Sequence, residues 1–301
     1  MLQLKNEKVA IPVVLFAGLL WSFGPLVVRY MNEPNLVLWQ YLFTRGLTIF
    51  CILNIYLFFE EGKIFYKNYL KIGFSGVTGG IGLGFAMITF IWSITNTSAA
   101  VTLLCLAAMP FITALLGFLF LKEKISLNVW LAMILAGIGI IIMALGNTSK
   151  VSLLGLTFGL ISAAGFSVFS VSLRWKKETP KFTTVAVAGI FCAVVSALVM
   201  ISDGTNFLSS SYNQGLFSIH GTLVCLGLIL YSIGSKAIPA AELTLLSLTE
   251  IIGGIFWVWL PILGINEVPS NNTITGGFLI FMSIIYYSLT IKTNRRFIAL
   301  N

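Results

Sequence analysis

Ten apolar runs, each close to twenty residues long, constrain this chain more than any other feature of its sequence. An α-helix needs about 20 mostly apolar residues to cross the hydrocarbon core of a bilayer. The polar/apolar alternation of a membrane β-barrel is missing from the sequence. We therefore expect an all-α polytopic membrane protein with ten transmembrane helices. The runs are Val9–Arg29, Leu36–Phe58, Leu70–Thr95, Ser98–Phe120, Leu127–Leu145, Leu153–Leu173, Thr183–Ser202, Phe217–Ser235, Ala240–Ile262 and Thr273–Ile291.

The composition agrees with this fold class and excludes several functions. Hydrophobic residues make up 58% of the chain and charged residues only 9%, which is typical of membrane proteins. The net charge of +8 would suggest nucleic acid elsewhere, but here the basic residues sit in short loops between apolar runs. We expect no nucleic-acid partner. The four cysteines lie inside apolar runs without metal-ligand spacing, so we expect no metal and no cofactor.

The distribution of Lys and Arg predicts the orientation. If the runs alternate in direction, fifteen of the eighteen basic residues fall on the side that holds the N-terminus. Only Arg29 and Lys150 fall on the other side, and Arg45 lies within a run. Basic residues accumulate in cytoplasmic loops, so the sequence predicts a cytoplasmic (inner) membrane protein with both termini in the cytoplasm. The fifteen are Lys5, Lys8, Lys63, Lys67, Lys71, Lys122, Lys124, Arg174, Lys176, Lys177, Lys181, Lys236, Lys292, Arg295 and Arg296.

Two pairs of segments indicate an internal repeat. Leu20–Arg29 is similar to Gly165–Arg174, and Ala99–Leu106 is similar to Ala241–Leu248. The offsets are 145 and 142 residues, close to half the chain. Chance likeness of apolar runs could explain either pair alone, but two pairs at nearly one offset favour a repeat.

The repeat predicts two five-helix halves, residues 1–146 and 147–301. Because five is odd, the second half would insert upside down relative to the first. Inverted repeats of this kind are typical of secondary transporters, whose binding sites lie near the bilayer midplane between the halves.

Glu250 is the most informative single residue, because it lies near the centre of an apolar run. A charge there costs about 2.5–3.5 kcal/mol on insertion scales, so its carboxyl should face protein or water. We expect it to bind a substrate ammonium or to carry a coupling proton. The alternatives are a structural carboxyl between helices, or a pair with Arg45. The first half has Ala108 at the matching position.

Other polar and aromatic residues share helix faces and are candidates for the wall of a binding cavity. Alternatively, the small and hydroxyl residues on these faces pack against neighbouring helices. This alternative also applies to the face with Ser98, Thr102, Cys105, Met109 and Thr113. The glycines between 73 and 84 indicate close helix packing, with GxxxG spacing at 76/80 and 80/84. His220 is assigned to an outer loop without a role. The candidate substrate-binding residues are Glu250, Trp21, Ser22, Thr89, Trp92, Asn96, Thr102, Phe166, Ser247 and Trp257.

Several motifs in order carry a family resemblance. The first half contains Leu19–Gly24, Phe43–Gly46, Ala107–Gly117 and Leu121–Lys124, and the second contains Ser247–Gly253, Leu263–Ser270 and Gly276–Leu279. Over nearly the whole chain these resemble EamA-type ten-helix proteins of the drug/metabolite transporter superfamily.

The resemblance has implications for individual residues. It implies a tryptophan near the centre of helix 1, here Trp21, and a helix-2 arginine, here Arg45. For Arg45 it favours a structural role, and contact with a substrate carboxylate is the alternative. It also implies that Glu123 and Glu267 cap or pair locally at helix ends. The chain departs from the family at Ile251, where a proline often follows the helix-9 glutamate, and this weakens the expectation of a helix break there.

The resulting hypothesis is a secondary transporter, not an enzyme. It would move a small polar metabolite, such as an amino acid, an amine or a related solute, by alternating access, with proton coupling left open. The expected partners are this solute and the lipid bilayer, and a homodimer is left open. A channel-like or structural membrane subunit is the alternative. An integral-membrane enzyme is less favoured, because the chain has one histidine and no clustered carboxylates.

Overall fold

The computed structural model describes residues 6–97, 99–145, 152–176, 178–266, 268 and 270–298. Within these residues the chain is helical and contains no strand. The predicted join at 146–147 lies outside the described residues, as do Lys5, Ser98, Lys150, Lys177, Glu267 and the side chains of Lys292, Arg295 and Arg296. The elements are α1 Glu7–Trp21, α2 Gly24–Tyr30, α3 Leu38–Glu61, η1 Gly62–Tyr66, α4 Lys67–Lys71, α5 Gly73–Asn96, α6 Ala99–Leu106, α7 Met109–Leu116, η2 Gly117–Leu121, α8 Leu127–Leu145, α9 Leu153–Trp175, α10 Lys181–Asp203, α11 Ser211–Gly234, α12 Ala240–Ser247, α13 Thr249–Trp259, η3 Pro261–Leu263 and α14 Asn271–Ile298.

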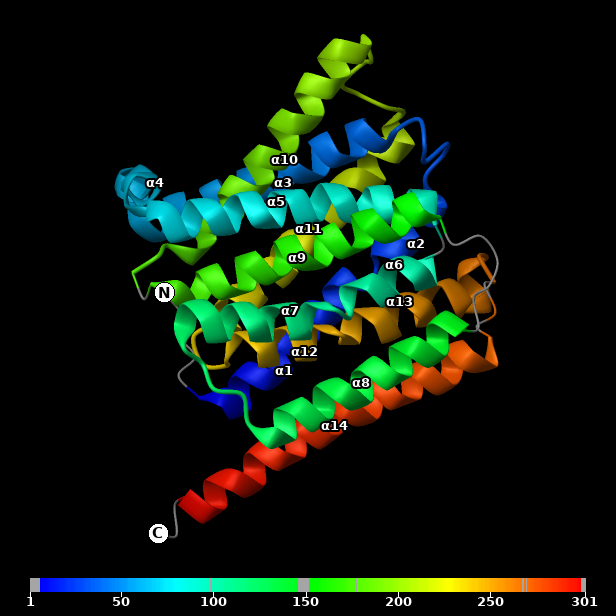
Figure 1. Cartoon of the computed structure of the whole chain (residues 1–301). Helices are drawn as coiled ribbons and strands as arrows, with labels where there is room; N and C mark the ends of the chain where they lie inside the picture. The colour runs from blue at the N-terminus through cyan, green and yellow to red at the C-terminus, as the bar shows by residue number, and fades with distance from the viewer. Residues whose placement is uncertain are drawn as a thin grey trace.

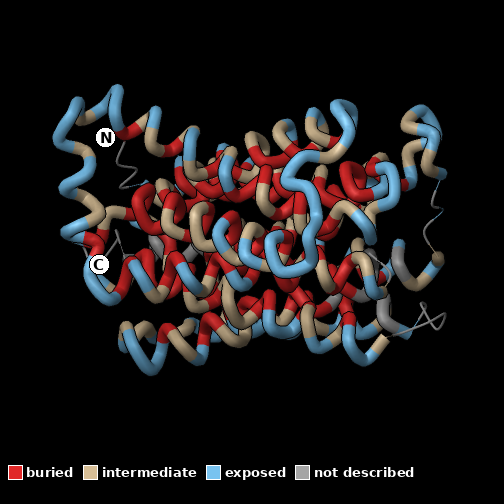
Figure 2. Tube along the Cα trace, turned by 90° about the horizontal axis from the view of Figure 1, so that it is seen from above, coloured by how far each residue is buried: buried red, intermediate tan, exposed pale blue. Residues whose placement is uncertain are grey.

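Seven segments are long and apolar enough to cross a membrane, and three shorter apolar helices accompany them, all within the described part of the chain. The predicted polytopic helical class agrees with this, while the count of ten spans stays a prediction. Figure 2 shows buried residues in the interior of the bundle and exposed ones on its outer turns. Many of the exposed side chains are large and apolar, such as Phe118, Leu198 and Ile201. An apolar surface of this extent suits contact with lipid.

Two of the long helical segments are interrupted where a proline follows. Pro25 sits in the first turn of α2 and Pro110 in the first turn of α7. A proline has no N–H, so the carbonyl four residues earlier loses its helical donor. The breaks at Ser22–Phe23 and Ala107–Ala108 follow from this.

A third interruption, at Leu248 between α12 and α13, occurs without a proline. The hydroxyl of Ser247 donates to the Thr244 carbonyl over 2.8 Å, and that of Thr249 donates to the Leu246 carbonyl over 3.1 Å. Hydroxyls that bond to nearby carbonyls compete with helical hydrogen bonds. A break is therefore present near Glu250 although Ile251 stands where the family often has a proline.

The helices pack in a bundle around α1, α5, α9 and α11 (Figure 1). α5 lies along α9 and α10, and α11 lies along α1 and α3. α3 crosses α10, α7 contacts α9 and α12, and α6 contacts α8 and α9. α1 contacts α12 and α13, and α13 contacts α2 and α14. α8 and α14 pair at one side of the bundle, where Figure 1 shows them running together.

The glycines of α5 allow its close contacts, as the GxxxG spacing predicts. A Cβ added at Gly80 would lie 2.7 Å from a Val187 side-chain carbon and 2.9 Å from the Thr184 carbonyl oxygen, both on α10. A Cβ added at Gly82 would lie 2.9 Å from the Gly165 carbonyl oxygen on α9. Because backbone atoms are among these neighbours, larger residues would force the helices apart.

Candidate functional site

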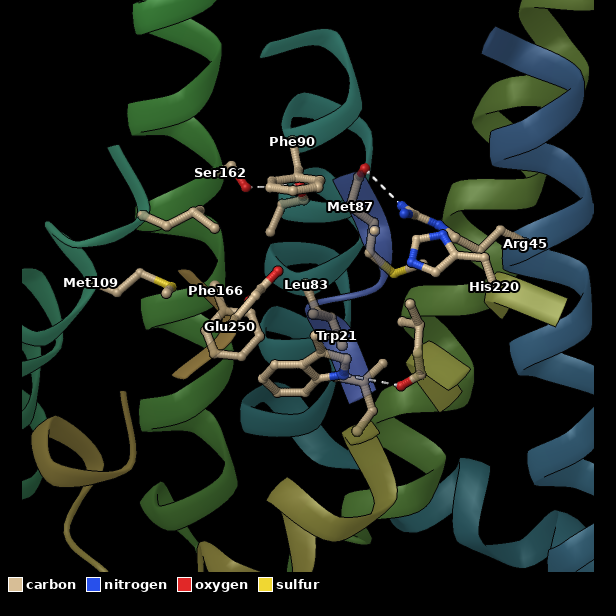
Figure 3. Close-up of a pocket in the computed structure, with 15 residues that line it drawn as sticks. Trp21, Arg45, Leu83, Met87, Phe90, Met109, Ser162, Phe166, His220 and Glu250 are labelled. Carbon is tan, nitrogen blue, oxygen red and sulfur yellow. Dashed lines mark hydrogen bonds between the residues drawn. The ribbon is translucent and has the colours of Figure 1, made fainter. Parts of the chain in front are cut away.

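A cavity lies at the centre of the bundle, between helices from both ends of the sequence. The empty space along it, part of which is open to solvent, amounts to about 590 Å³. Figure 3 shows its side chains converging from several helices. The lining residues are Trp21, Gly24, Arg45, Leu83, Ala86, Met87, Phe90, Leu106, Met109, Ser162, Phe166, His220, Val224, Leu228 and Glu250.

Glu250 reaches this cavity because it is the second residue of α13, directly after the break at Leu248. α1 approaches the break closely, since a Cβ added at Gly18 would lie 3.2 Å from the Ser247 carbonyl oxygen and 3.4 Å from the Glu250 amide nitrogen. The positive end of the α13 dipole favours a carboxylate at this position. In Figure 3 the Glu250 side chain points into the cavity.

Arg45 lies on the opposite wall and is held by several contacts. Its Nη2 donates to the Met87 carbonyl over 2.8 Å, and its Nη1 donates to the Tyr41 hydroxyl over 3.3 Å. The guanidinium carbon also lies 5.1 Å from the centre of the Tyr41 ring. The buried Nε of Arg45 has no hydrogen-bond acceptor among the described residues. An unmet buried donor costs about 1–3 kcal/mol, so a ligand oxygen near this group would be favoured.

His220 extends the wall that Arg45 begins. Its Nδ1 forms a hydrogen bond with the Tyr41 hydroxyl, and the two rings are parallel within 4°. His220 is buried within α11, so the assignment to an outer loop was wrong. The helix begins at Ser211, six residues before the predicted run, because Ser210 caps it by accepting from the Asn213 amide. The polar first turns of α11 conceal this start from a hydropathy pattern.

Glu250 and Arg45 do not form a direct pair. No ion pair within 4.0 Å joins them among the described residues. Figure 3 shows the two side chains on different sides of the cavity. The open alternative in which Arg45 neutralises Glu250 by contact is therefore not the arrangement seen. The two charges are available to different ends of a bound molecule.

Aromatic side chains form the floor between the two charges. The rings of Trp21 and Phe166 meet edge to face, with centroids 5.4 Å apart at 81°. Tyr231 packs against both, at 5.4 Å from Trp21 and 5.3 Å from Phe166. The Trp21 indole nitrogen donates to the Val224 carbonyl over 3.2 Å, which fixes the ring. These contacts make a rigid apolar surface inside the cavity.

Two of the predicted residues lie beside the cavity and support it. Ser22 is fully buried, and its hydroxyl donates to the Leu19 carbonyl over 2.6 Å. The same oxygen accepts a 2.8 Å hydrogen bond from the Trp257 indole nitrogen, and Trp257 stacks on Phe23. They join α1 to α13 but do not line the cavity.

The remaining predicted residues lie elsewhere. The hydroxyls of Thr89 and Ser247 donate to carbonyls of their own helices, those of Phe85 and Thr244. Thr102 is buried against Ser93, and Trp92 packs between Trp39 and Phe158. Asn96 is exposed at the end of α5 and donates to the Trp92 carbonyl. The structure thus brings Glu250, Arg45, Trp21 and Phe166 together and leaves the rest outside.

The α5 residues that were predicted to line the cavity do not line it. The predicted stripe of Thr89, Trp92 and Asn96 lies next to the face that lines the cavity, which carries Leu83, Ala86, Met87 and Phe90. Residues of the missed face are apolar and give no sequence signal of a site. The fold identifies these residues, because it places them beside Arg45, whose guanidinium donates to the Met87 carbonyl.

A second feature lies at the end of the bundle where α1 begins. Arg174, at the end of α9, pairs with Glu123 over 2.6 Å and donates to the carbonyls of Ser235 and Ile238 over 2.8 and 2.7 Å. Glu123 also accepts from the Ala240 amide at the start of α12 over 3.1 Å. Local capping and pairing by Glu123 is therefore confirmed. We call these five residues the Arg174 clamp.

Comparison with known proteins identifies a family over the first half of the chain. Residues 8–145 match the EamA-like transporter family. This match confirms the resemblance to EamA-type proteins that the motifs indicate. An "Uncharacterized transporter" of Helicobacter pylori strain J99 is 24% identical over 252 residues, 80% of this chain and 80% of that protein. "Protein RarD" of Salmonella typhi is 23% identical over 305 residues, 97% of this chain and 99% of that protein.

The fold also has a counterpart among solved structures. One crystal structure superposes with a TM-score of 0.76 at 18% identity, covering 96% of this chain and 99% of that one. Likeness at this identity concerns the fold alone. It shows that the helical arrangement of this chain recurs in another protein along nearly its whole length.

Proposed function

We propose that this chain is a secondary transporter that moves a small polar metabolite across the cytoplasmic membrane by alternating access. The observation that carries the proposal is the central cavity, which places a carboxylate and a guanidinium on different walls with aromatic rings between them. Such a cavity suits a solute with a cationic group, an anionic group and an apolar part. Amino acids and related zwitterions have this composition, and amines share half of it.

The contacts between helices support two inverted five-helix halves. Suppose that α1–α2, α3, α5, α6–α7 and α8 correspond in order to α9, α10, α11, α12–α13 and α14. Exchanging the halves then turns the contact of α5 with α9 into that of α11 with α1, and the contact of α5 with α10 into that of α11 with α3. The contacts of α9 with α6 and α7 become those of α1 with α12 and α13. The pairs α3 with α10 and α8 with α14 map onto themselves.

Local geometry repeats at the same offset. The helix breaks at Ala107 and Leu248 are 141 residues apart, and the left-handed residues Lys122 and Gly264 are 142 apart. Trp21 and Phe166, which the repeat aligns, meet on the floor of the cavity. These correspondences support a pseudo-two-fold arrangement with the cavity between the halves, as in transporters built from inverted repeats.

We assign the substrate ammonium to Glu250 and a substrate carboxylate to Arg45. Glu250 accepts no hydrogen bond from any described residue, and the Nε of Arg45 has no acceptor. Both groups therefore have bonding capacity that a ligand can fill. Ten spans with both termini in the cytoplasm complete the proposal, supported by Figure 1, where α4 and the end of α14 lie at the end of the bundle where α1 begins.

The Arg174 clamp supports alternating access because it joins three segments that close one end of the bundle. It links the end of α9, the segment after η2 and the connection from α11 to α12. The cytoplasmic end is thus held together in this conformation. Opening that end requires these hydrogen bonds to break and the halves to rock about the cavity.

Transport assays in proteoliposomes test the proposal. Purified protein is reconstituted, and labelled amino acids and amines are followed by counterflow and by uptake driven by a pH gradient. We expect saturable flux for at least one solute of this class. Its absence for every such solute, with correctly inserted protein, would contradict a transport function.

The Glu250→Gln variant separates the two roles open to this carboxylate. If Glu250 binds the ammonium, both counterflow and driven uptake fall by about 10- to 100-fold, because a hydrogen bond to a charged group contributes about 1.5–3 kcal/mol. If Glu250 carries a coupling proton, driven uptake falls while counterflow survives. Asp203→Asn, which removes an exposed carboxylate at the end of α10, is the matched control and should change neither.

A further inference from the structure

The segment Gly62–Lys71, which comprises η1 and α4, joins α3 to α5 at the end of the bundle where α1 begins. Figure 1 shows α4 end-on while α3 and α5 run across the view, so this segment lies roughly perpendicular to both. Glycines with positive φ make the two corners, Gly62 at 63° and Gly73 at 60°. Other residues would be strained there. Since α3 and α5 run along the bundle, the segment lies in the plane of the membrane surface.

Side-chain contacts fix the orientation of the segment on α3. The Tyr69 hydroxyl donates to Asn54 Oδ1 over 2.8 Å, and the Asn68 amide donates to Glu61 Oε2 over 2.6 Å. The Phe65 ring packs against the bundle core, with Phe58 as a neighbour. The segment is therefore a fitted element with a fixed outer surface.

The outer surface combines lysines with large apolar side chains. Lys63, Lys67 and Lys71 follow one another at four-residue intervals and are all exposed. Between them, Ile64, Tyr66 and Leu70 are 58%, 54% and 81% exposed. Basic and apolar residues together on a helix are typical of segments that lie in a membrane interface.

We propose that the segment Gly62–Lys71 binds the headgroups of anionic phospholipids. The lysine ammonium groups contact the lipid phosphates, while Ile64 and Leu70 enter the boundary of the acyl chains. A bilayer is the fitting partner because the neighbouring turns of α3 and α5 also expose apolar rings, Phe59 and Phe74, beside the segment. An acidic protein would complement the lysines but not these rings. The inference requires the membrane location and goes beyond the proposed transport, on whose substrate it does not depend.

Native mass spectrometry of the full-length protein in detergent tests this inference. The protein is titrated with phosphatidylglycerol and with phosphatidylcholine of the same acyl chains, and an apparent Kd is obtained for each lipid. The variant Lys63→Gln/Lys67→Gln/Lys71→Gln is compared with Lys8→Gln/Lys122→Gln/Lys236→Gln. The second variant removes three exposed lysines from the same end of the bundle. A third, Lys63→Arg/Lys67→Arg/Lys71→Arg, keeps the charge of the segment, and melting midpoints check the fold of all three.

We expect the wild type to prefer phosphatidylglycerol, and the first variant to lose roughly 100-fold in its affinity for that lipid. This follows from a contribution of about 1 kcal/mol for each lysine near an anionic surface. The arginine variant and the control should bind phosphatidylglycerol nearly as the wild type does. Unchanged binding by the first variant would overturn the inference. An equal loss in the control would overturn it as well, because the attraction would then belong to the whole basic end.

Discussion

The crossing of α3 and α10 permits a quantitative test of the packing. A Cβ added at Gly46 would lie 2.6 Å from the Gly189 carbonyl oxygen and 2.9 Å from the Ala193 amide nitrogen. Reciprocally, a Cβ at Gly189 would lie 2.8 Å from the Gly46 carbonyl oxygen. These neighbours are backbone atoms, so no change of rotamer relieves the clash and Gly46→Ala must push the helices apart. Overpacking of this kind costs about 1–3 kcal/mol.

The matched control is Gly215→Ala on α11, where an added Cβ meets no atom within 4 Å. Both substitutions gain the same helix propensity, about 0.5–1 kcal/mol, so the difference between them isolates the packing cost. Thermal unfolding in one detergent at one heating rate, followed by tryptophan fluorescence, measures it. With about 2–4 °C per kcal/mol, Gly46→Ala should melt roughly 2–12 °C below Gly215→Ala. Equal midpoints would refute the close approach of α3 and α10.

Three further substitutions address the cavity and the clamp. Trp21→Phe keeps the aromatic floor but loses the hydrogen bond to α11, so substrate affinity should fall by less than about tenfold. Trp21→Ala should reduce the affinity further. Saturation curves of uptake compare the two variants. Arg174→Lys keeps the charge but not the planar guanidinium that bonds Glu123. Because this ion pair is partly exposed, stability should fall by only about 1 kcal/mol. A double-mutant cycle with Glu123→Gln that gives no coupling energy would contradict this. Tyr41→Phe removes the hydroxyl that joins two cavity-lining side chains, so we expect a higher KM for transport, and unchanged kinetics would show that this bond does not position them.

Much of the fold follows from the hydropathy pattern. The predicted runs Leu36–Phe58 and Leu70–Thr95 lie within three residues of α3 and α5 at each boundary. Prolines identify two helix breaks because the loss of an N–H is a property of the residue itself. The break at Leu248 has no proline beside it, so the sequence does not mark its position.

The site could be predicted only where its chemistry is unusual for a membrane. Glu250 and Arg45 stand out because charges are costly inside apolar runs. Hydroxyl residues do not stand out, since in Thr89 and Ser247 the hydroxyl bonds to a carbonyl of its own helix and needs no cavity. His220 already lies inside the predicted run Phe217–Ser235, but only the fold shows that its side chain reaches the cavity. Helical periodicity shows which residues share a face, but the partner of each face comes from the fold.

The two charges of the cavity come from different parts of the chain, Arg45 from the first proposed half and Glu250 from the second. With Gly46 aligned on Gly189, which it meets reciprocally, Arg45 is matched by Ala188, and Glu250 is matched by Ala108. If the halves were produced as separate polypeptides, two copies of the first would confront two guanidiniums, and two copies of the second would confront two carboxylates. Like charges in a cavity of low dielectric repel strongly. Only a mixed assembly would restore one of each, so each of the two proposed halves would depend on the other for its opposite charge.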